Sequence, residues 1–290
     1  MKKLLVIADQ DNKRHAALQR GIALATQTGA TIHWVGFAYM REEGMEFLTA
    51  AQRSTVKASL LASKRKDMEN TLSKSPKAKV DIEIVWEKDV AGWILKHVAG
   101  NNYDMVLKTG HRSESLIYTP TDWQLLRECP VPVMIVASKT WKKRARIVAA
   151  VDLSTKVDSK RALNYKVLAM ARSLADASDG ELHLAYTIEV PQVLSDLDLI
   201  DGRKLAAKRR KALQPIIAGL REQYGIASEH VHLRQGSAGK AIPSIATKLK
   251  ADLVVIGTVG RKGLHGRLMG NTAEQVLTRL HTDIVALKPD

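Results

Sequence analysis

The chain contains only one cysteine, Cys129, among its 290 residues. A single cysteine cannot form a disulfide within the chain, and we expect Cys129 to be a buried packing residue in a protein of a reducing compartment. Long apolar runs are also missing, since none approaches the ~18 residues that span a bilayer. The apolar start at residues 4–8 is cut off by Asp9, which fits a first β-strand better than a signal peptide. These absences predict a soluble, cytoplasmic protein with no membrane span.

Aromatic residues are scarce at 4%, which leaves little material for stacking nucleic-acid bases. Acidic residues are too few to balance the basic ones, so the chain carries a formal net charge of +15, which favours polyanionic partners. Lysine and arginine are scattered, with clusters at residues 142–146 and 208–211. We interpret these clusters as a linker and a solvated helix face. Nucleic-acid binding is the more weakly supported alternative, and it predicts binding that weakens steeply with salt.

The chain contains two copies of one unit. Each copy opens with a short apolar strand that ends in aspartate, Asp9 in the first copy and Asp152 in the second. In the first copy the predicted strands cover residues 4–9, 29–35, 80–86, 104–108 and 132–136, and the predicted helices 14–28, 41–74 and 90–100. In the second copy the strands cover residues 147–152, 180–186, 231–233, 252–256 and 284–287, and the helices 159–177, 192–224 and 238–249.

This alternation predicts the fold class and the domains. Continuous apolar strands separated by helices indicate an α/β fold with a parallel sheet covered on both faces. The polar, basic connector at residues 138–146 is the predicted boundary. We therefore predict one domain at residues 1–138 and a second at residues 146–290.

The most informative segment is a glycine loop near the C-terminus. An apolar strand at residues 252–256 ends at Gly257, Gly260 follows after two residues, and a basic loop leads to Gly270, Asn271 and Thr272. Glycines let the backbone approach a ligand closely and adopt positive φ. Unpaired N–H groups at the start of the next helix favour anions. This arrangement is typical of a phosphate-binding loop.

On the strength of these segments, the chain resembles the universal stress protein family in its tandem form, over nearly its whole length. The resemblance implies two doubly wound, five-stranded parallel sheets of the adenine-nucleotide alpha-hydrolase-like type, each with strand order 3-2-1-4-5, packed as a pseudo-dimer. In ATP-binding members the loop glycines cradle the phosphates, and the aspartate after the first strand lies beside the nucleoside.

The resemblance implies a site in the second half of the chain. It places Gly257, Gly260 and Gly270 around the phosphates of ATP or a related adenine nucleotide, with or without Mg²⁺, and Asp152 beside the nucleoside. Thr187, at the end of the second strand, is expected near the base.

One residue of this site departs from the family pattern, which has serine or threonine after the last glycine. Asn271 stands there, and asparagine can cap a helix as well as serine can. Its amide can donate to a phosphate oxygen, but it is bulkier. Thr272 offers a hydroxyl one residue out of register.

The first half departs further from the family pattern. Thr109 and Arg112 stand where Gly257 and Gly260 stand in the second half, and alignment puts Tyr118 opposite Gly270. Because a Cβ at these places prevents close approach of a phosphate, we expect the first site to have lost phosphate binding. The segment at residues 119–122 still predicts a helix cap with proline at the first helical position.

The sequence shows no catalytic or metal-binding spacing. The nine histidines are dispersed, and there is no CxxC pair, His-Glu-x-x-His or nucleophile elbow. His183, inside a predicted strand, and His230 and His232, beside another, are interpreted as structural. We expect a stress-response protein that acts by binding rather than by turnover, although slow ATP hydrolysis and association of two chains stay open.

A different function is the alternative. It is that of a stress protein without nucleotide binding, which acts through protein, nucleic-acid or apolar-ligand contacts. Four tryptophans fall in the first half and offer material for an apolar site, although core packing is the preferred interpretation: Trp34, Trp86, Trp93 and Trp123.

The glycine loop generates one prediction. Gly260→Arg, which copies Arg112 of the first half, should abolish adenine-nucleotide binding and leave the fold intact, because the added side chain occupies the place of the phosphates. Titration calorimetry and circular dichroism measure the two effects. An unchanged affinity would remove Gly260 from the site.

Overall fold

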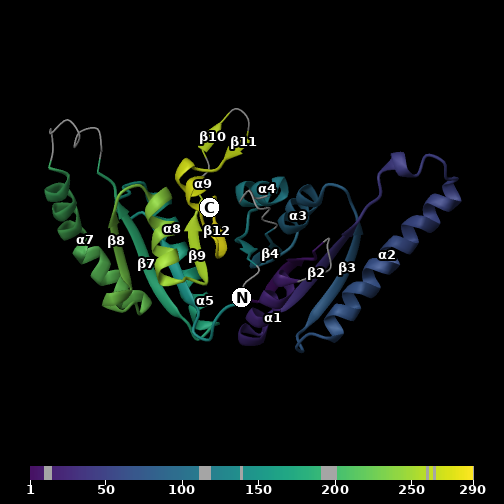
Figure 1. Ribbon diagram of the computed structural model, residues 1–290, viewed down its shortest axis with the longest axis horizontal. Coiled ribbons are helices and arrows are strands. Elements are labelled where there is room, and N and C mark those ends of the chain that lie inside the picture. The colour runs from purple at the N-terminus through teal and green to yellow at the C-terminus, as the bar shows by residue number, and fades with distance from the viewer. Residues whose placement is uncertain are drawn as a thin grey trace. The chain divides into compact units, whose positions relative to one another are not determined.

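The computed structural model describes residues 1–9, 15–110, 119–137, 140–190, 201–258, 261–263 and 266–289. These residues divide into two compact units, one ending at Thr140 and the other beginning at Trp141. Each unit is built on five parallel strands with helices on both faces of the sheet (Figure 1). The predicted fold class is therefore confirmed, while the packing of the halves as a pseudo-dimer stays a prediction.

In the first unit the sheet order is β3-β2-β1-β4-β5, and each strand is parallel to its neighbours in this order. The elements are β1 (Lys3–Ile7), α1 (Ala16–Thr28), β2 (Thr31–Ala38), α2 (Ala50–Ser73), β3 (Val80–Trp86), α3 (Val90–Ala99), β4 (Met105–Thr109), α4 (Pro120–Glu128) and β5 (Val133–Val136). This is the 3-2-1-4-5 order that the resemblance implied.

The second unit repeats this order as β8-β7-β6-β9-β12. Its elements are β6 (Arg146–Ala150), α5 (Asp158–Asp176), β7 (Glu181–Ile188), α7 (Gly202–Tyr224), the 3-10 turn η2 (Ser228–His230), β8 (Val231–Gln235), α8 (Ala238–Leu249), β9 (Leu253–Gly257), α9 (Asn271–Leu277) and β12 (Asp283–Leu287). The expected basic loop after β9 contains a short antiparallel ribbon, β10 (Arg261–Gly263) with β11 (Gly266–Leu268). Among the described residues no helix is both long and apolar enough to cross a membrane.

The central strands form the core of each unit because helices cover both of their faces. Leu5 and Val6 in β1, and Val148 in β6, have no exposed surface. Crossovers between parallel strands are right-handed, and this handedness decides which face of the sheet each helix covers. A chain that moves outward from β1 to β3 places α1 and α2 on one face, and the return to β4 and β5 places α3 and α4 on the other. Two predicted packing residues, Trp34 and Cys129, are buried with 0% and 1% of their surface exposed.

The long second helix of the first unit starts later than its sequence pattern predicts. It begins at Ala50 rather than near residue 41 because a capping box fixes its start. The Thr49 hydroxyl accepts from the Gln52 N–H at 3.3 Å, and the Gln52 side chain accepts from the Thr49 N–H at 2.9 Å. Two N–H groups that the helix leaves unpaired are satisfied in this way.

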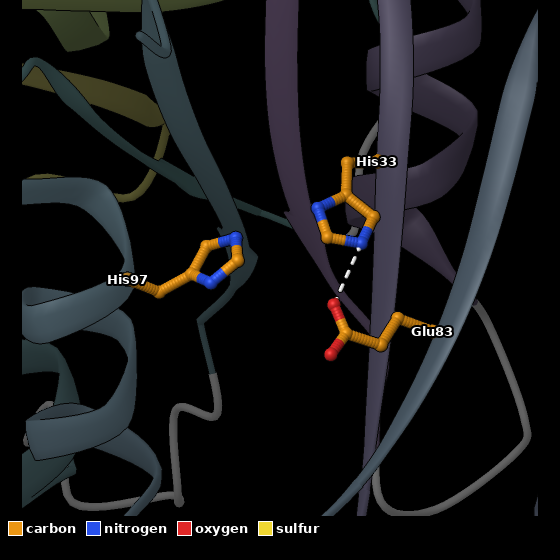
Figure 2. Close-up of side chains that lie close together, drawn as sticks. All are labelled: His33, Glu83 and His97. Atoms are coloured by element: carbon orange, nitrogen blue, oxygen red, sulfur yellow. Dashed lines mark ion pairs between the residues drawn. The ribbon is translucent and has the colours of Figure 1, made fainter. Parts of the chain in front are cut away.

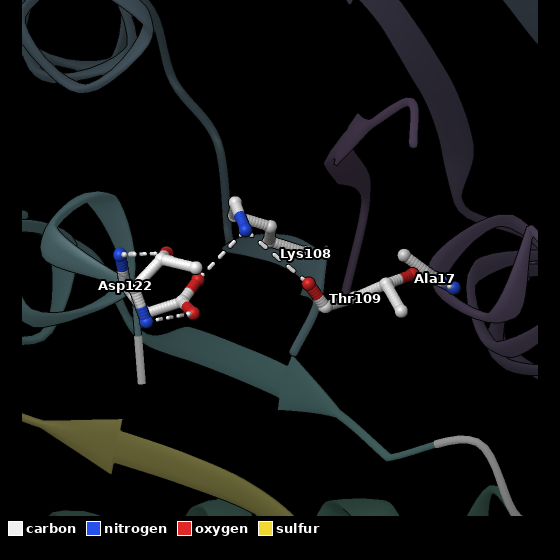
Figure 3. Close-up of polar contacts among 5 residues, drawn as sticks. Ala17, Lys108, Thr109 and Asp122 are labelled. Atoms are coloured by element: carbon white, nitrogen blue, oxygen red, sulfur yellow. Dashed lines mark hydrogen bonds and ion pairs between the residues drawn. The ribbon is translucent and has the colours of Figure 1, made fainter. Parts of the chain in front are cut away.

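A buried ion pair joins β4 to α4 in the first unit (Figure 3). The Lys108 ammonium lies 2.7 Å from Asp122 Oδ1, with only 11% and 0% of the two side chains exposed. The other oxygen of Asp122 accepts from the Thr119 N–H at 3.1 Å, and the Thr119 hydroxyl accepts from the Asp122 N–H at 3.2 Å. The predicted helix cap, with Pro120 as the first helical residue, is confirmed.

Removing one charge of this pair should strongly destabilise the protein. Asp122→Ala leaves the Lys108 ammonium buried without its counter-ion, and we expect a loss of about 3–5 kcal/mol in the free energy of unfolding. The double variant Lys108→Met/Asp122→Leu removes both charges, so it should recover all but about 1 kcal/mol, the part that the helix cap contributes. Denaturant unfolding measures both. Equal losses in the two variants would mean that the cap, not the charge, dominates.

Candidate functional site

A cavity of about 580 Å³ opens at the carboxyl ends of the central strands of the second unit. It lies where β6 and β9 run side by side, while the chain leaves β6 for α5 and enters β9 from α8. Neighbouring strands whose connections run to opposite faces leave a crevice between them, which is where open α/β sheets bind ligands. The cavity is lined by six of the predicted site residues: Asp152, Thr187, Gly257, Gly270, Asn271 and Thr272. The seventh, Gly260, lies outside the described residues.

Asp152 follows β6 and organises the turn at the edge of the cavity. Its Oδ1 accepts from the Ser154 N–H at 3.1 Å and from the Ser154 hydroxyl at 2.9 Å. The Asn164 side chain, on α5, makes two hydrogen bonds with the backbone of Asp152. It donates to the Asp152 carbonyl at 2.7 Å and accepts from the Asp152 N–H at 3.0 Å. Asp152 therefore holds this turn and also lines the cavity.

Gly257 ends β9, and close packing explains its lack of a side chain. A Cβ added there would lie 2.6 Å from Cδ2 of Leu163 on α5. The nearest atoms to the added Cβ therefore belong to Leu163. The packing of α5 on the sheet therefore requires a glycine here, and its expected role in the approach of a phosphate stays a prediction.

The start of α9 differs from the sequence expectation. Gly270 is its N-cap, with φ −66° and ψ 137°, and has no side chain that could accept a capping hydrogen bond. These angles are open to any residue, so positive φ is not the reason for glycine here. Asn271 is the first helical residue rather than the cap, so the capping that asparagine allows does not take place here. Asn271 and Thr272 are both exposed at the cavity.

Several cavity residues were not identified from the sequence. Lys160 on α5 and Arg209 on α7 bring two cations to the lining, and Glu189 brings a carboxylate. Arg209 belongs to the basic cluster at residues 208–211, which the sequence predicted only as a solvated helix face. Tyr186 also lines the cavity, and burial raises the pKa of its hydroxyl above the usual 10. A neutral phenol at the cavity edge can both donate and accept hydrogen bonds.

The corresponding place in the first unit is filled. Lys108 and Ile256 occupy equivalent positions, because Lys108 pairs with Ile7, the last residue of β1, and Ile256 pairs with Ala150, the last residue of β6. Asp122 is the third residue of α4, as Ala273 is of α9. Ile256 and Ala273 line the cavity of the second unit, whereas the first unit carries a buried ion pair at both places.

Thr109 shows how the glycine position of the first unit has been reused. Its hydroxyl accepts from the Ala17 N–H at 3.0 Å, at the start of α1 (Figure 3). The cap positions also correct the alignment, because Thr119, and not Tyr118, is the N-cap that corresponds to Gly270. Arg112 and Tyr118 lie outside the described residues.

Two domain matches decide the family. The model described as the universal stress protein family matches residues 1–137 and again residues 143–288. The chain belongs to the universal stress protein family. It is 32% identical over 301 residues to the universal stress protein E homolog of Haemophilus influenzae, covering 99% of this chain and 97% of that protein. It is 31% identical over 307 residues to universal stress protein E of Escherichia coli K12, covering 100% and 94%.

A solved structure shares the fold of the whole chain. A functionally unknown protein of Pseudomonas aeruginosa PAO1 superposes with a TM-score of 0.75 at 27% identity, covering 100% of this chain and 93% of that one. Both the tandem organisation and the fold are therefore those of universal stress proteins.

The packing of Gly257 can be tested without any ligand. Gly257→Ala should lower the free energy of unfolding by about 1–3 kcal/mol, because the new methyl group overlaps Leu163. Gly219→Ala is the matched control. A Cβ there meets nothing within 4 Å on the exposed side of α7, so it should stabilise the helix by roughly 0.5–1 kcal/mol. Denaturant unfolding compares the two, and a neutral Gly257→Ala would contradict the packing argument.

Proposed function

We propose that this universal stress protein is a cytoplasmic stress-response protein that binds one adenine nucleotide per chain, in the cavity of the second unit. The observation that carries the proposal is the convergence of Asp152, Thr187 and Gly257 with the start of α9 on one cavity at the crossover point of the sheet. These residues come from four separate segments. Their meeting is what the resemblance to nucleotide-binding members implied.

The size and charge of the cavity support a nucleotide. Its volume of about 580 Å³ lies within the range of about 300–1,000 Å³ usual for small-molecule sites. Lys160 and Arg209 line it and would offset the charge of the phosphates. α9 has only seven residues, so its dipole is a minor contribution beside these side chains.

The chemistry that we propose is binding rather than turnover. Asp152 and Glu189 are the carboxylates of the lining, and a Mg²⁺ ion that arrived with the nucleotide would find its oxygen ligands there. Asp152 Oδ1 is already engaged by Ser154, which suits a positioning group better than a general base. The ion pair of Lys108 and Asp122 in the first unit supports a stoichiometry of one nucleotide per chain.

Calorimetric titration with Mg-ATP tests the proposal. The full chain should bind one equivalent, and Thr272→Trp should weaken binding at least tenfold, because the indole would fill the cavity from an exposed position on α9. Glu274→Trp is the matched control, since Glu274 is exposed on the same helix and does not line the cavity. Its affinity should equal that of the wild type.

The outcomes are distinct. Absence of heat at millimolar ATP in the wild type would reject nucleotide binding. Equal losses in the two tryptophan variants would reject the cavity as the site.

A further inference from the structure

Three histidines that are distant in the sequence meet in the second unit. His183 lies on β7, His230 ends η2 and His232 lies on β8. The rings of His183 and His230 are 4.1 Å apart between centroids, and those of His183 and His232 are 5.3 Å apart. None of the three lines the nucleotide cavity, because His183 precedes Thr187 by four residues, about 13 Å along a strand. The sequence showed no metal spacing because these residues come from three different segments.

His183 carries a buried nitrogen without a hydrogen-bond partner. The residue is 3% exposed, and its Nε2 has no hydrogen bond to any residue that the structure describes. Burial, together with the neighbouring His230 and His232, lowers the pKa of His183 to about 3. A buried polar atom without a partner is costly, and each such atom in a native fold calls for an explanation, an ion being one.

The nitrogen points toward a carboxylate at a distance that suits a shared metal ion. His183 Nε2 and Glu181 Oε2 are 3.6 Å apart, which is longer than a hydrogen bond. Two ligands about 2.0–2.1 Å from one tetrahedral ion lie roughly 3.3–3.5 Å from each other. One ligand atom from each of Glu181, His183 and His230 falls within 4.8 Å of the others.

The opposite side of the ring is held in place. His183 Nδ1 lies 3.1 Å from His232 Nε2. When Nδ1–H donates to His232, Nε2 is the unprotonated nitrogen, and its lone pair can bind a metal ion. Metal-binding histidines are usually fixed in this way by a hydrogen bond on their other nitrogen.

The first unit has an equivalent cluster that is closed by hydrogen bonds. His33 occupies the register position of His183, since the two pair with Leu5 and Val148 in the first strand of each unit. His33 Nε2 lies 3.0 Å from Glu83, and Figure 2 shows the ring of His97 reaching from its helix toward this pair. The Tyr103 hydroxyl joins the two rings, at 2.6 Å from His33 Nδ1 and 2.9 Å from His97 Nε2.

The second unit lacks the residues that close this network. Ala251 lies two residues before β9, as Tyr103 lies two residues before β4. Ile245 is the eighth residue of α8, as His97 is the eighth residue of α3. His232 replaces Glu83 in register. His33 Nε2 pairs with Glu83, whereas His232 lies against Nδ1 of His183, and His183 Nε2 has no hydrogen-bond partner among the described residues.

We propose that Glu181, His183 and His230 bind one divalent transition-metal ion, of which zinc suits this donor set best, and that His232 orients His183 from outside the coordination shell. Imidazole and carboxylate ligands favour such ions over magnesium and calcium. The ion would connect η2, which leads into the edge strand β8, to β7. This site is independent of the nucleotide cavity.

One neighbouring cation opposes the ion. Arg146 Nε lies 3.7 Å from Glu181 Oε2, and both side chains are about two-fifths exposed, at 43% and 40%. Such a pair contributes little, on the order of 0–1 kcal/mol. A metal bound by three ligands would displace it.

The test is zinc titration of tag-free full-length protein that has been dialysed against a chelator. Calorimetry, with competition by a chromophoric chelator, should find one tight equivalent of Zn²⁺. Co²⁺ should give the visible absorption of a tetrahedral nitrogen and oxygen site. His230→Ala and Glu181→Gln, at partly exposed positions, should each weaken binding at least 100-fold. His232→Ala should weaken it by about 10- to 100-fold, the range expected for an orienting partner.

His97→Ala in the first unit is the matched control, and its zinc stoichiometry and affinity should equal those of the wild type. Circular dichroism checks that every variant is folded. Absence of a tight equivalent in the wild type, or a loss in His97→Ala as large as that in His230→Ala, would overturn the proposal.

Discussion

The geometry of the second unit depends on one constraint, the right-handed crossover of parallel strands. It sends α5 and α7 to one face of the sheet and α8 and α9 to the other, so the chain separates between β6 and β9. The cavity exists because no helix can cover that point. The turn held by Asp152 and the close approach of Gly257 to Leu163 both shape its edges. The candidate site is therefore a consequence of strand order, and its side chains decide only what can bind.

The two units show how the same backbone can carry opposite chemistry. At matched register positions the second unit presents Ile256 and Ala273 to a cavity, while the first has Lys108 and Asp122 in contact with each other. The histidine clusters differ in the same direction. In the first unit Tyr103 completes a network of hydrogen bonds, and in the second His183 Nε2 has no hydrogen-bond partner among the described residues. Both polar centres are thus closed in the first unit, and both are open in the second.

Much of the fold could be predicted because its signals are local. Apolar runs, the aspartates after the first strands and the cap at residues 119–122 specify strands, a duplication and a helix start. Six of the seven predicted site residues meet at one cavity for the same reason, since strand ends of a parallel sheet share an edge. The seventh, Gly260, lies outside the residues described.

The remaining features depend on contacts between distant segments. Arg209 reaches the cavity from a helix whose charges look solvated in the sequence. His183, His230 and His232 meet through the pairing of β7 with β8, which no spacing in the sequence reveals. The role of Asn271 was misplaced by one residue because the start of a short helix such as α9 depends on the chain that precedes it.

The hydrogen bond to the Thr109 hydroxyl has a consequence for the order in which the protein folds during its synthesis. His15 makes no side-chain bond at the start of α1, and the Ala17 N–H instead finds its acceptor on a residue 92 positions further along the chain. β1 is likewise flanked by β2 and by the distant β4. While the ribosome is still synthesising the middle of the first unit, its opening helix lacks an acceptor and its central strand lacks a neighbour. The N-terminal quarter of this chain must therefore wait for β4 before it can reach its final structure.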